Sequence, residues 1–500
     1  MVKQALTRLA RRPALLLVAP LAITLCHCGR ADAASQRTVS ELSQNASQHQ
    51  TVPALVATES AFLDTLEART FQFFWERSDP HSGLTPDRWP TRSFASVSAT
   101  GFALTAYPIG VERGYVSRPA ARERVLNTLR FFWTAPQDTS RSGALGYRGF
   151  FYHFLEPETG HRFEAVELST VDTALFLAGA LFCQTYFDGP DPSEVEIRAL
   201  ADSLYGRADW QWAQVRPPAI GHGWSPEHGP LPYDWRGYNE ATLLYLLALG
   251  SPTHPVGMDA WREYTSRYKW GTFEGQEHVG FAPLFGHQYT HAWIDFRGIQ
   301  DDFMRLHDSD YFENSRRATL AQRAYAVANP NAWAGYGPQL WGLTACDGPL
   351  DGRLTIGGRE REFHTYWARG ASFTEVHDDG TISPAAAGGS IAFAPEIAIP
   401  ALIAMRAAYG TNVFGKYGFV DALNPTIVDP TATHHGHVVA GLGWFDTDYL
   451  GIDQGPILIM AENYRTGFVW RTMQRNPHVV RGLRAAGFTG GWLGAAPEKH

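Results

Sequence analysis

The sequence predicts an all-α protein built as an (α/α)6 toroid, and three observations lead to this fold class. Segments that are apolar on nearly every side alternate with amphipathic segments, as expected of an inner ring of helices wrapped by an outer ring. Long connections rich in glycine and proline, of which the chain holds 48 and 31, separate these segments. Strand-like stretches are few and short. An irregular helical fold has the same periodicity and stays the alternative.

Helical periodicity predicts these segments in chain order: 59–76, 98–112, 121–133, 169–187, 192–208, 238–249, 258–268, 314–328, 395–408, 456–474 and 476–486. Segments 169–187 and 238–249 are apolar nearly all round, so we expect them to be inner helices. Segments 121–133 and 192–208 each have one polar face, which indicates outer helices. The stretch 148–154 resembles a strand and predicts one of several minor β-hairpins. Long ordered loops tend to carry function, so functional residues are expected between the helices.

The N-terminal segment has the pattern of an export signal. A basic start is followed by an apolar run over 14–25 and by the A-x-A sequence that ends at Ala33. The run is too short for a permanent membrane span, so a periplasmic or secreted location is expected. Lipid attachment at Cys26 or Cys28 is less favoured, because the residues before each fit a lipobox poorly. The predicted organisation is a signal peptide (1–33), a linker (34–58), one catalytic domain (59–492) and a C-terminal tail (493–500).

The composition is that of a globular protein without the features of a nucleic-acid binder. Hydrophobic residues make up 44% of the 500 positions and charged residues 18%. The formal net charge is −8 and no basic stripe occurs, which argues against a nucleic-acid partner. We expect a monomer. Cys183 and Cys346 remain after cleavage of the signal, and the sequence leaves open whether they form a disulfide or two buried thiols.

Acidic residues at the starts of predicted inner helices are the first candidates for chemistry. Glu167 lies just before a helix that Ser169 or Thr170 can cap, and Asp172 follows three residues after Ser169. This spacing favours a capping box for Asp172, with catalysis as the second interpretation. For Glu167, a structural and a functional role are equally supported. Glycoside hydrolysis is the chemistry considered, because it requires two carboxyl groups on either side of the scissile bond.

A second polar group precedes the apolar segment 241–249. Its members are Asp234, Trp235, Tyr238, Asn239 and Glu240. Glu240 could simply place a favourable charge at the helix N-terminus, worth about 0.3–1 kcal/mol. A simple charge of this kind would not need the surrounding aromatic and polar side chains, so we favour a role for Glu240 in the site.

A third group combines histidines with aromatic residues and an arginine: His287, Gln288, His291, Trp293 and Arg297. His287 and His291 have the spacing of a zinc-protease H-E-x-x-H helix, but Gln288 stands where the catalytic glutamate would be. Binding of sugar hydroxyls is therefore the favoured interpretation, and a metal site is the minor one. The loop cluster of His434, His435 and His437 has the same two interpretations, with simple solvation favoured.

Other acidic and aromatic residues occupy comparable places, and we assign them to substrate binding: Trp341, Asp347, Glu396 and Asp453. Glu462 lies inside an apolar segment, and Arg465 three residues on is its expected ion-pair partner. Asp378 and Asp379 before Gly380 predict only a turn. Competing chemistries lack their patterns, because the sequence has no Walker loop, no G-x-S-x-G elbow and no G-x-G-x-x-G after a strand.

Seven stretches resemble, in the same order, a family of bacterial glycoamylase-like proteins related to endo-β-1,2-glucanases and to the glycoamylase-like domain of cyclic β-1,2-glucan synthases. These stretches are ELSTVDTA (167–174), DWRGYNEA (234–241), FGHQYTHAWIDFRG (285–298), YFENSRRAT (311–319), WGLTACDGP (341–349), FAPEIAIPAL (393–402) and YLGIDQGPI (449–457). The resemblance extends from about residue 60 to 492. It implies an (α/α)6 barrel, a β-1,2-glucan substrate, a carboxylate mechanism, and neither metal nor cofactor. At the matching positions it implies that Glu240 and Glu167 are the principal acids, with Asp172 nearby.

The function predicted from these features is endo-acting, inverting hydrolysis of β-1,2-glucan. Glu240 is the expected acid, Glu167 its partner and Asp172 a third candidate. Substrate contacts are predicted for Asp234, Trp235, Tyr238, Asn239, His287, Gln288, His291, Trp293, Arg297, Trp341, Asp347, Glu396 and Asp453. One alternative is an exo-acting or transglycosylating β-glucan enzyme, and another is a non-catalytic periplasmic glycan-binding protein. Acids at buried helix starts argue against the last, because a binding module gains little from desolvated carboxylates.

Overall fold

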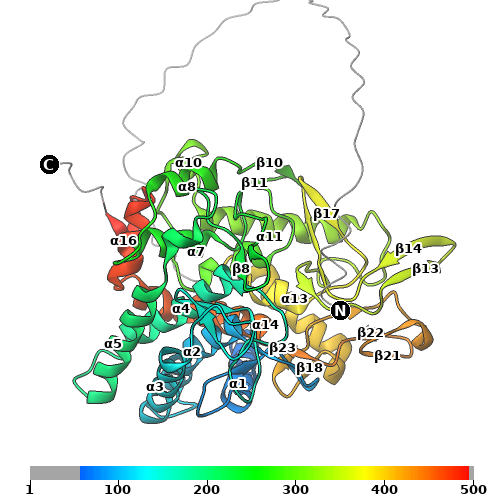
Figure 1. Ribbon diagram of the computed structural model, residues 1–500. Helices are drawn as coiled ribbons and strands as arrows, with labels where there is room; N and C mark the ends of the chain where they lie inside the picture. The colour runs from blue at the N-terminus through cyan, green and yellow to red at the C-terminus, as the bar shows by residue number, and fades with distance from the viewer. Residues whose placement is uncertain (1–56, 495–500) are drawn as a thin grey trace, which may run out of the picture. The chain divides into compact units, whose positions relative to one another are not determined.

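A closed ring of apolar helices forms the core of the computed structural model, which describes residues 57–494 (Figure 1). Its members are α2 (Val97–Glu112), α4 (Thr170–Tyr186), α7 (Thr242–Gly250), α9 (Phe285–Gln288), α12 (Pro384–Gly388) and α14 (Gly451–Thr466). Helix α2 packs against both α4 and α14, α4 packs against α7, and α12 packs against α14. Two hydrogen bonds complete the ring: Leu243 N in α7 donates to Thr290 Oγ1 beside α9, and Gln288 Nε2 in α9 donates to Ala386 O in α12.

The burial of these helices follows from their composition. Every residue of α7 is buried, as are nearly all of those in α4. Helices α2 and α4 approach so closely that a Cβ atom at Gly179 would collide with the Gly101 carbonyl oxygen, which explains the glycine there. The predictions that 169–187 and 238–249 form inner helices are confirmed, although α7 begins later than predicted, at Thr242.

Amphipathic helices wrap this ring: α1 (Ala57–Arg77), α3 (Arg118–Thr134), α5 (Pro192–Arg207), α8 (Met258–Thr265), α11 (Tyr311–Ala328) and α13 (Pro395–Tyr409). Helix α3 packs against α2 and α5 and buries Val125, Leu129 and Phe132, while its opposite face is polar. Helix α5 in turn packs against α4. The predicted outer positions of 121–133 and 192–208 are therefore confirmed.

The remaining helices are α6 (Trp210–Ala213), α10 (Asp302–Leu306), α15 (Phe468–Met473) and α16 (Pro477–Ala485). Helix α16 confirms the segment predicted at 476–486, whereas the others show where periodicity is a poor guide. The single helix predicted over 456–474 is wrong, because Gly467 adopts a φ of 66° and separates α14 from α15. Helices α9 and α12 were not predicted, because they span only 4 and 5 residues and are too short to show a helical period.

The chain has more sheet than predicted, so the all-α assignment is corrected to a mainly helical fold with many short sheets. The largest sheet has the strand order β4-β5-β7-β8-β9. Its strands are β4 (Gly146–Tyr147), β5 (Phe150–Tyr152), β7 (Leu168–Ser169), β8 (Gly223–Ser225) and β9 (Gly229–Pro230). The strand predicted at 148–154 is confirmed as β5 and the start of β6 (Phe154–Leu155). Strands of two or three residues leave no alternation for a sequence to reveal, which explains why the others were missed.

Strand pairing holds the starts of three inner helices together. Strand β7 runs into α4, β23 (Tyr449–Leu450) into α14, and β3 (Ala95–Ser96) into α2. Strand β23 pairs with β2 (Arg88–Trp89), upstream of α2. The backbone of His153 joins the other two starts, since its O accepts from Val97 N and its N donates to Glu167 O. The N-terminal ends of α2, α4 and α14 therefore face the same end of the ring.

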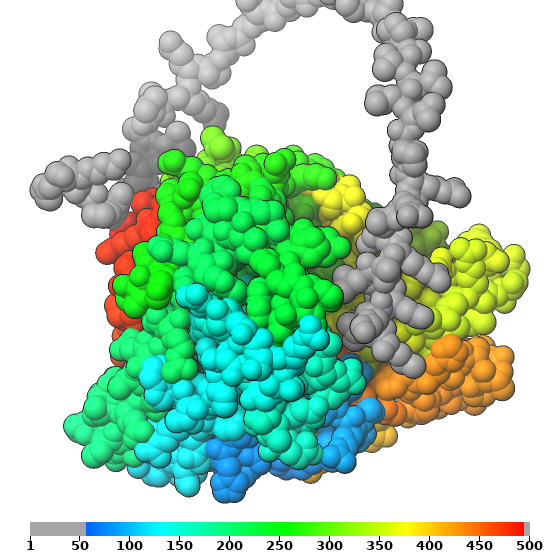
Figure 2. Space-filling model, viewed as in Figure 1, coloured from blue at the N-terminus to red at the C-terminus, as the bar shows by residue number. Residues whose placement is uncertain are grey.

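The other strands form small sheets and hairpins: β1 (Thr85–Pro86), β10 (Trp270–Phe273), β11 (Gln276–Val279), β12 (Ala345–Cys346), β13 (Gly352–Ile356), β14 (Arg359–Phe363), β15 (Trp367–Ala368), β16 (Gly370–Ser372), β17 (Glu375–His377), β18 (Phe414–Gly415), β19 (Gly418–Phe419), β20 (Leu423–Asn424), β21 (His437–Val439) and β22 (Gly443–Phe445). Hairpins β13–β14 (yellow-green) and β21–β22 (orange) lie side by side at one edge of the face in Figure 2.

The predicted signal peptide, most of the predicted linker and most of the predicted tail lie outside the described residues. Helix α1 begins at Ala57, just inside the predicted linker. The sequence left open whether Cys183 and Cys346 form a disulfide. In the structure they are two free, buried thiols. Within 57–494, every helix is too short or too polar to cross a bilayer.

Candidate active site

Helix α4 begins at an N-cap, Ser169, as its sequence predicts. Ser169 Oγ accepts a hydrogen bond from Asp172 N at 3.3 Å and donates one to Asp172 Oδ2 at 2.5 Å. These bonds hold the Asp172 carboxylate at the first turn of the helix, where only 7% of the residue is exposed. The N-cap predicted for Ser169 is confirmed, whereas Asp172 accepts from the Ser169 hydroxyl instead of from its backbone N–H, so the second bond of a capping box is replaced.

His153 joins Asp172 to Glu167. Its Nδ1 lies 2.8 Å from Glu167 Oε1 and its Nε2 lies 3.5 Å from Asp172 Oδ2. Burial alone would lower the pKa of His153, but the two carboxylates outweigh burial and raise this pKa to about 9. For Glu167, burial alone would raise the pKa, but the hydrogen bond from His153 lowers this pKa to below its ordinary value. At neutral pH Glu167 is therefore ionised, and 36% of its side chain is exposed to solvent.

Glu240 has the opposite electrostatic environment. It lies two residues before α7, and in the described part of the chain no cation pairs with its carboxylate. Burial, with the negative charge of Asp172 adding to it, raises the pKa of Glu240 to about 7. A large fraction of Glu240 is thus protonated at neutral pH. The charge of Asp172 acts on Glu240, and His153 joins Asp172 to Glu167, so the three acids predicted to be catalytic share one electrostatic environment.

Two of the predicted substrate contacts hold the loop that carries Glu240. Trp235 Nε1 donates to Thr170 Oγ1 at the start of α4, and the Trp235 ring stacks on His222 with centroids 3.7 Å apart. Tyr238 packs against His287. Trp235 and Tyr238 are only 8% and 6% exposed, so most of each ring contacts protein.

A second group of acids lies at the same end of the ring, around the start of α14. Asp453 is in the first turn of α14, and the charges of Asp87 and Asp347 both act on it. Burial raises the pKa of Asp453 to about 7 and that of Asp347 to about 6. Arg88 pairs with Asp87 at 3.1 Å and with Asp347 at 2.5 Å, while Asp347 N donates to Asp421 Oδ2. The structure therefore brings together two predicted substrate contacts, Asp347 and Asp453.

Tyr289 connects the two groups of acids. Burial raises the pKa of its phenol well above the ordinary value, and the charges of Asp453, Glu240 and Asp172 raise it further. One side chain is thus within electrostatic reach of acids from α4, from the loop before α7 and from α14. The two groups belong to one polar region at the N-terminal end of the ring.

Five predicted substrate contacts lie inside the protein, each at most 2% exposed: His287, Gln288, His291, Trp293 and Trp341. Burial lowers the pKa values of His287 and His291 to about 3, so both imidazoles are neutral. Trp293 Nε1 donates to Thr105 Oγ1, which joins the segment after α9 to α2. Sugar contact at these five positions stays a prediction, and their burial disfavours it.

The other predicted contacts have partners within the protein: Asp234 pairs with Arg216, Asn239 Oδ1 accepts from Ala241 N, Arg297 pairs with Asp295, and Glu396 pairs with Arg316. The Asn239 bond is a turn contact two residues along the chain, since α7 has Ala241 as its N-cap and no side-chain cap. Glu396 lies on the outer helix α13. Among residues 57–494, neither Arg297 nor Glu396 forms an ion pair with either group of acids.

Several residues of the site carry no recognisable sequence motif. His153 is in the strand-like stretch 148–154, and Arg88 is in a strand of two residues. Neither has a spacing that would assign it to a site. Asp379 does more than form the predicted turn, because it makes an ion pair at 2.7 Å with Arg369, which is fully buried. A turn pattern in the sequence gave no sign of this distant partner.

The predicted ion pair between Glu462 and Arg465 is wrong. Glu462 pairs with Arg113 at 2.5 Å, and Arg465 pairs with Glu67 at 2.5 Å. Arg113 caps the C-terminus of α2, which packs against α14. The partner from the neighbouring helix therefore replaces the partner one turn away on the same helix.

The fold and this polar region define a class of protein: helical rings whose buried carboxyl groups gather where the inner helices begin. The family profile described as putative glucoamylase matches residues 232–477. A solved structure of a putative glucoamylase from Bacteroides fragilis NCTC 9343 is 30% identical, with a TM-score of 0.73, over 88% of this chain and 99% of that one. The chain belongs to this glycoamylase family.

Two relatives that are named as β-1,2-glucan hydrolases are similar over most of the chain. The endo-β-1,2-glucanase from Chitinophaga pinensis is 28% identical, with a TM-score of 0.73, over 88% of this chain and 100% of that one. The exo β-1,2-glucooligosaccharide sophorohydrolase from Parabacteroides distasonis is 26% identical over 475 residues, or 88% of this chain. This chain spans 60% of the length of that relative.

Proposed function

We propose that the protein is a glycoside hydrolase that cleaves β-1,2-glucan, with Glu240 as general acid and Glu167 as general base. One observation carries the proposal: the pKa of Glu240 is raised to about 7, whereas the pKa of nearby Glu167 is lowered. At neutral pH one carboxyl group can therefore donate a proton while the other can accept one. Environments that separate two pKa values in this way are how glycosidases assign the two roles.

Glu240 supplies the proton that the leaving oxygen needs. Its carboxylate has no cationic partner within the described chain, and the nearby charge of Asp172 favours the protonated form. When the bond from C1 to the glycosidic oxygen breaks, the proton moves from Glu240 to that oxygen, and Glu240 becomes a carboxylate.

Glu167 removes a proton from the attacking water. The 2.8 Å hydrogen bond from His153 keeps Glu167 ionised and fixes its orientation, and its exposed side chain allows water to approach. Attack at C1 on the face opposite the leaving group inverts the anomeric configuration. Glu167 then releases its proton to solvent and the Glu240 carboxylate takes one up from solvent, which together restore the starting state.

The β-1,2 linkage and the endo mode rest on similarity to the Chitinophaga pinensis endo-β-1,2-glucanase. Similarity to the exo-acting Parabacteroides distasonis enzyme supports the second candidate, release of a disaccharide from a chain end. We also propose that the ring is an (α/α)6 toroid, in which each inner helix pairs with an outer one. Because the N-terminus has a signal-peptide pattern, we place the enzyme in the periplasm or outside the cell.

Chromatography of the products formed from glucans of defined linkage tests the proposal. We expect β-1,2-glucan to yield a ladder of oligomers, while β-1,3-, β-1,4- and α-1,4-glucans stay intact. A single disaccharide product would establish the exo candidate, and products longer than the substrate would establish transfer. Absence of reducing ends with every glucan would contradict hydrolysis. NMR of the first anomer released tests inversion, and retention of configuration would assign Glu167 as a nucleophile instead.

A further inference from the structure

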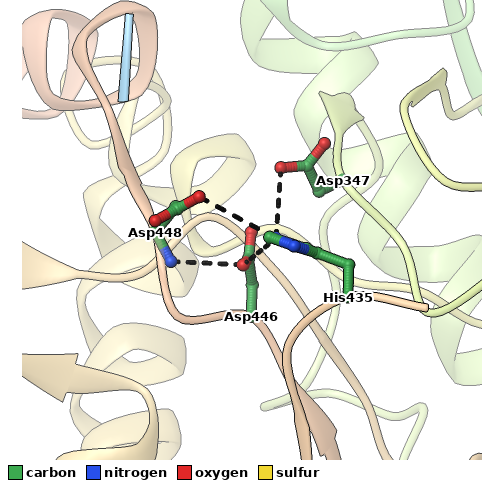
Figure 3. A group of neighbouring side chains, drawn as sticks. All are labelled: Asp347, His435, Asp446 and Asp448. Carbon is green, nitrogen blue, oxygen red and sulfur yellow. Dashed lines mark hydrogen bonds and ion pairs between the residues drawn. The ribbon is translucent and has the colours of Figure 1, made fainter. Parts of the chain in front are cut away.

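Four side chains converge beside the second group of acids, at the ends of hairpin β21–β22 and after strand β12. They are Asp347, His435, Asp446 and Asp448, and one ligand atom from each lies within 4.8 Å of the others (Figure 3). His435 Nε2 is 2.7 Å from Asp446 Oδ1, 3.7 Å from Asp347 Oδ2 and 3.9 Å from Asp448 Oδ2. With metal–ligand bonds of about 2.0–2.2 Å, donor atoms of one coordination shell lie about 3–4.4 Å apart, so these groups are nearly in place.

Asp448 supplies an independent sign that a cation belongs here. The residue is fully buried, and its Oδ1 accepts a hydrogen bond from Thr91 N at 2.9 Å. Its Oδ2, the atom that faces His435 in Figure 3, has no hydrogen-bond donor within residues 57–494. A buried carboxylate oxygen without a donor is unfavourable, and a cation between Asp448 and His435 would satisfy it.

Asp446 also has a carboxylate oxygen that lacks a hydrogen-bond donor. It is also fully buried, and its Oδ1 accepts from Thr447 N at 2.5 Å and from Asp448 N at 3.1 Å. Its Oδ2 has no donor in the part of the chain that the structure describes. Backbone hydrogen bonds therefore hold both aspartates rigidly while one oxygen of each is left unsatisfied. Such rigid positioning is typical of residues held in place to bind a ligand.

The charge balance points to a divalent ion. Arg88 lies at the flank of the cluster, with Nη1 2.5 Å from Asp347 Oδ2 and 3.9 Å from Asp448 Oδ2. Its Nε pairs with Asp87 at 3.1 Å, so this guanidinium is shared with an acid outside the cluster. When His435 is a neutral ligand, the three carboxylates carry three negative charges and the shared guanidinium offsets at most one, so at least two remain. A divalent cation neutralises that charge.

We propose that Asp347, His435, Asp446 and Asp448 bind one divalent metal ion. Three carboxylate oxygens and one imidazole nitrogen suit Mn²⁺ or Zn²⁺, whereas Ca²⁺ takes six to eight oxygen ligands. The sequence pattern predicted no metal and favoured a solvated loop for His435, because the three aspartates are not in a recognisable spacing with it. The ion fastens hairpin β21–β22 to the segment after β12, next to Asp421 and the start of α14. This role is structural and does not depend on the reaction that the enzyme catalyses.

Calorimetry and thermal unfolding of the full chain test the proposal. Protein treated with EDTA and dialysed is titrated with MnCl₂, ZnCl₂ or CaCl₂, and its Tm is measured by circular dichroism with and without each metal. We expect one Mn²⁺ or Zn²⁺ ion per chain and a rise in Tm on binding. For Asp448→Asn and His435→Gln we expect affinity at least tenfold weaker and no metal-dependent rise in Tm. The readout is the change caused by metal in each variant, so a lower starting Tm does not obscure it.

Asp378→Asn is the matched control. Asp378 is a partly buried aspartate whose oxygens accept hydrogen bonds from Trp333 Nε1 and Tyr336 Oη, so it needs no cation. Its variant is expected to respond to metal as the unaltered protein does. Absence of heat and of a Tm change with all three metals would overturn the proposal, as would an undiminished response in Asp448→Asn. A response to Ca²⁺ alone would overturn the assignment of metal class. Glucan hydrolysis is not a readout, so failure of that proposal would leave this result unaffected.

Discussion

Buried acids at the two ends of the helical ring have different neighbours. At the C-terminal ends of α2 and α14, Arg113 pairs with Glu462 and Arg465 pairs with Glu67, so two guanidinium groups face two carboxylates. At the N-terminal end, Glu240 has no cationic partner in the described residues. Compensated acids at one end join helices together, whereas the uncompensated acid at the other end is free to exchange a proton.

A raised pKa is found at both ends of the ring, so it does not by itself distinguish a catalytic acid from a structural one. Burial raises the pKa of Glu67 to about 7, although Arg113 and Arg465 oppose it, and burial raises that of Glu240 to the same value. What differs is the partner, because Glu67 is held by arginines and Glu240 is not. The comparison teaches that an acid with an unusual pKa is a candidate for catalysis only when its neighbours leave it unpaired.

The same chemical change at the two ends should give the largest contrast. Glu240→Gln removes the proton donor and keeps the size of the side chain, so we expect kcat/KM for β-1,2-glucan to fall about 10²–10⁴-fold. Binding of glucan, measured by calorimetry, should persist. The matched variant Glu462→Gln, at the other end of the ring, should keep its activity per folded molecule. Full activity in Glu240→Gln would remove this residue from the mechanism.

Stability should show the reverse contrast. Arg113→Met leaves Glu462 and Glu67 with one arginine fewer, and Glu462 is only 1% exposed. Breaking a buried pair by removal of one partner costs about 3–5 kcal/mol, which urea unfolding would detect. Glu240→Gln breaks no ion pair and should lose much less. Equal losses in the two variants would contradict the distinction between the paired Glu462 and the unpaired Glu240.

The pH dependence should report the protonation of Glu240. Because Glu240 must carry its proton, kcat/KM should fall about tenfold per pH unit above about pH 7. The folded state holds this proton more tightly than the unfolded state, whose pKa is near 4.5. The stability contribution is therefore complete below about pH 4.5 and is lost as pH rises through about 7. In Glu240→Gln this part of the decline in Tm should disappear, and an unchanged decline would assign it to another group.

The smallest expected effect comes from His153, a positioning residue. His153→Gln removes the positive charge that lowers the pKa of Glu167, so the acidic limb of the pH–activity profile should move to higher pH. At pH 7 the loss should stay within about tenfold, because Glu167 is still ionised there. A uniform loss at every pH, with the limb unmoved, would indicate that His153 only supports the fold.

Helices with many residues were predictable because their burial is periodic along the chain. Segments 121–133 and 169–187 repeat their apolar residues over several turns, and both became helices close to the predicted bounds. Helix α12 shows no such repeat, because it spans only five residues. The break at Gly467 was missed because one residue with positive φ leaves the apolar pattern of its neighbours intact.

The candidate site shows the same distinction: contacts between near neighbours in the chain were predictable, and contacts between distant residues were not. The cap of α4 by Ser169, which also bonds Asp172, is a contact between near neighbours, and its spacing predicted it. The bond between His153 and Glu167 joins residues that flank the paired strands β5 and β7, and no spacing in the chain predicts it. His435 was read as part of a loop because Asp347 lies far from it in sequence. Trp293 was expected at the substrate, yet the ring of helices encloses it.

By itself the sequence determined the inner and outer helices, the caps at their starts and the acids placed there, because these depend on residues within a few turns of one another. Only the tertiary structure decided which acids meet arginine and which do not, since that depends on the side chains that neighbouring helices and strands bring alongside. Glu462 and Glu240 are both glutamates beside apolar helical segments, and the packing gives one an ion pair and leaves the other with a proton. Burial and charge compensation are properties of three-dimensional neighbours, so the pKa values that set the chemistry arise when the ring closes.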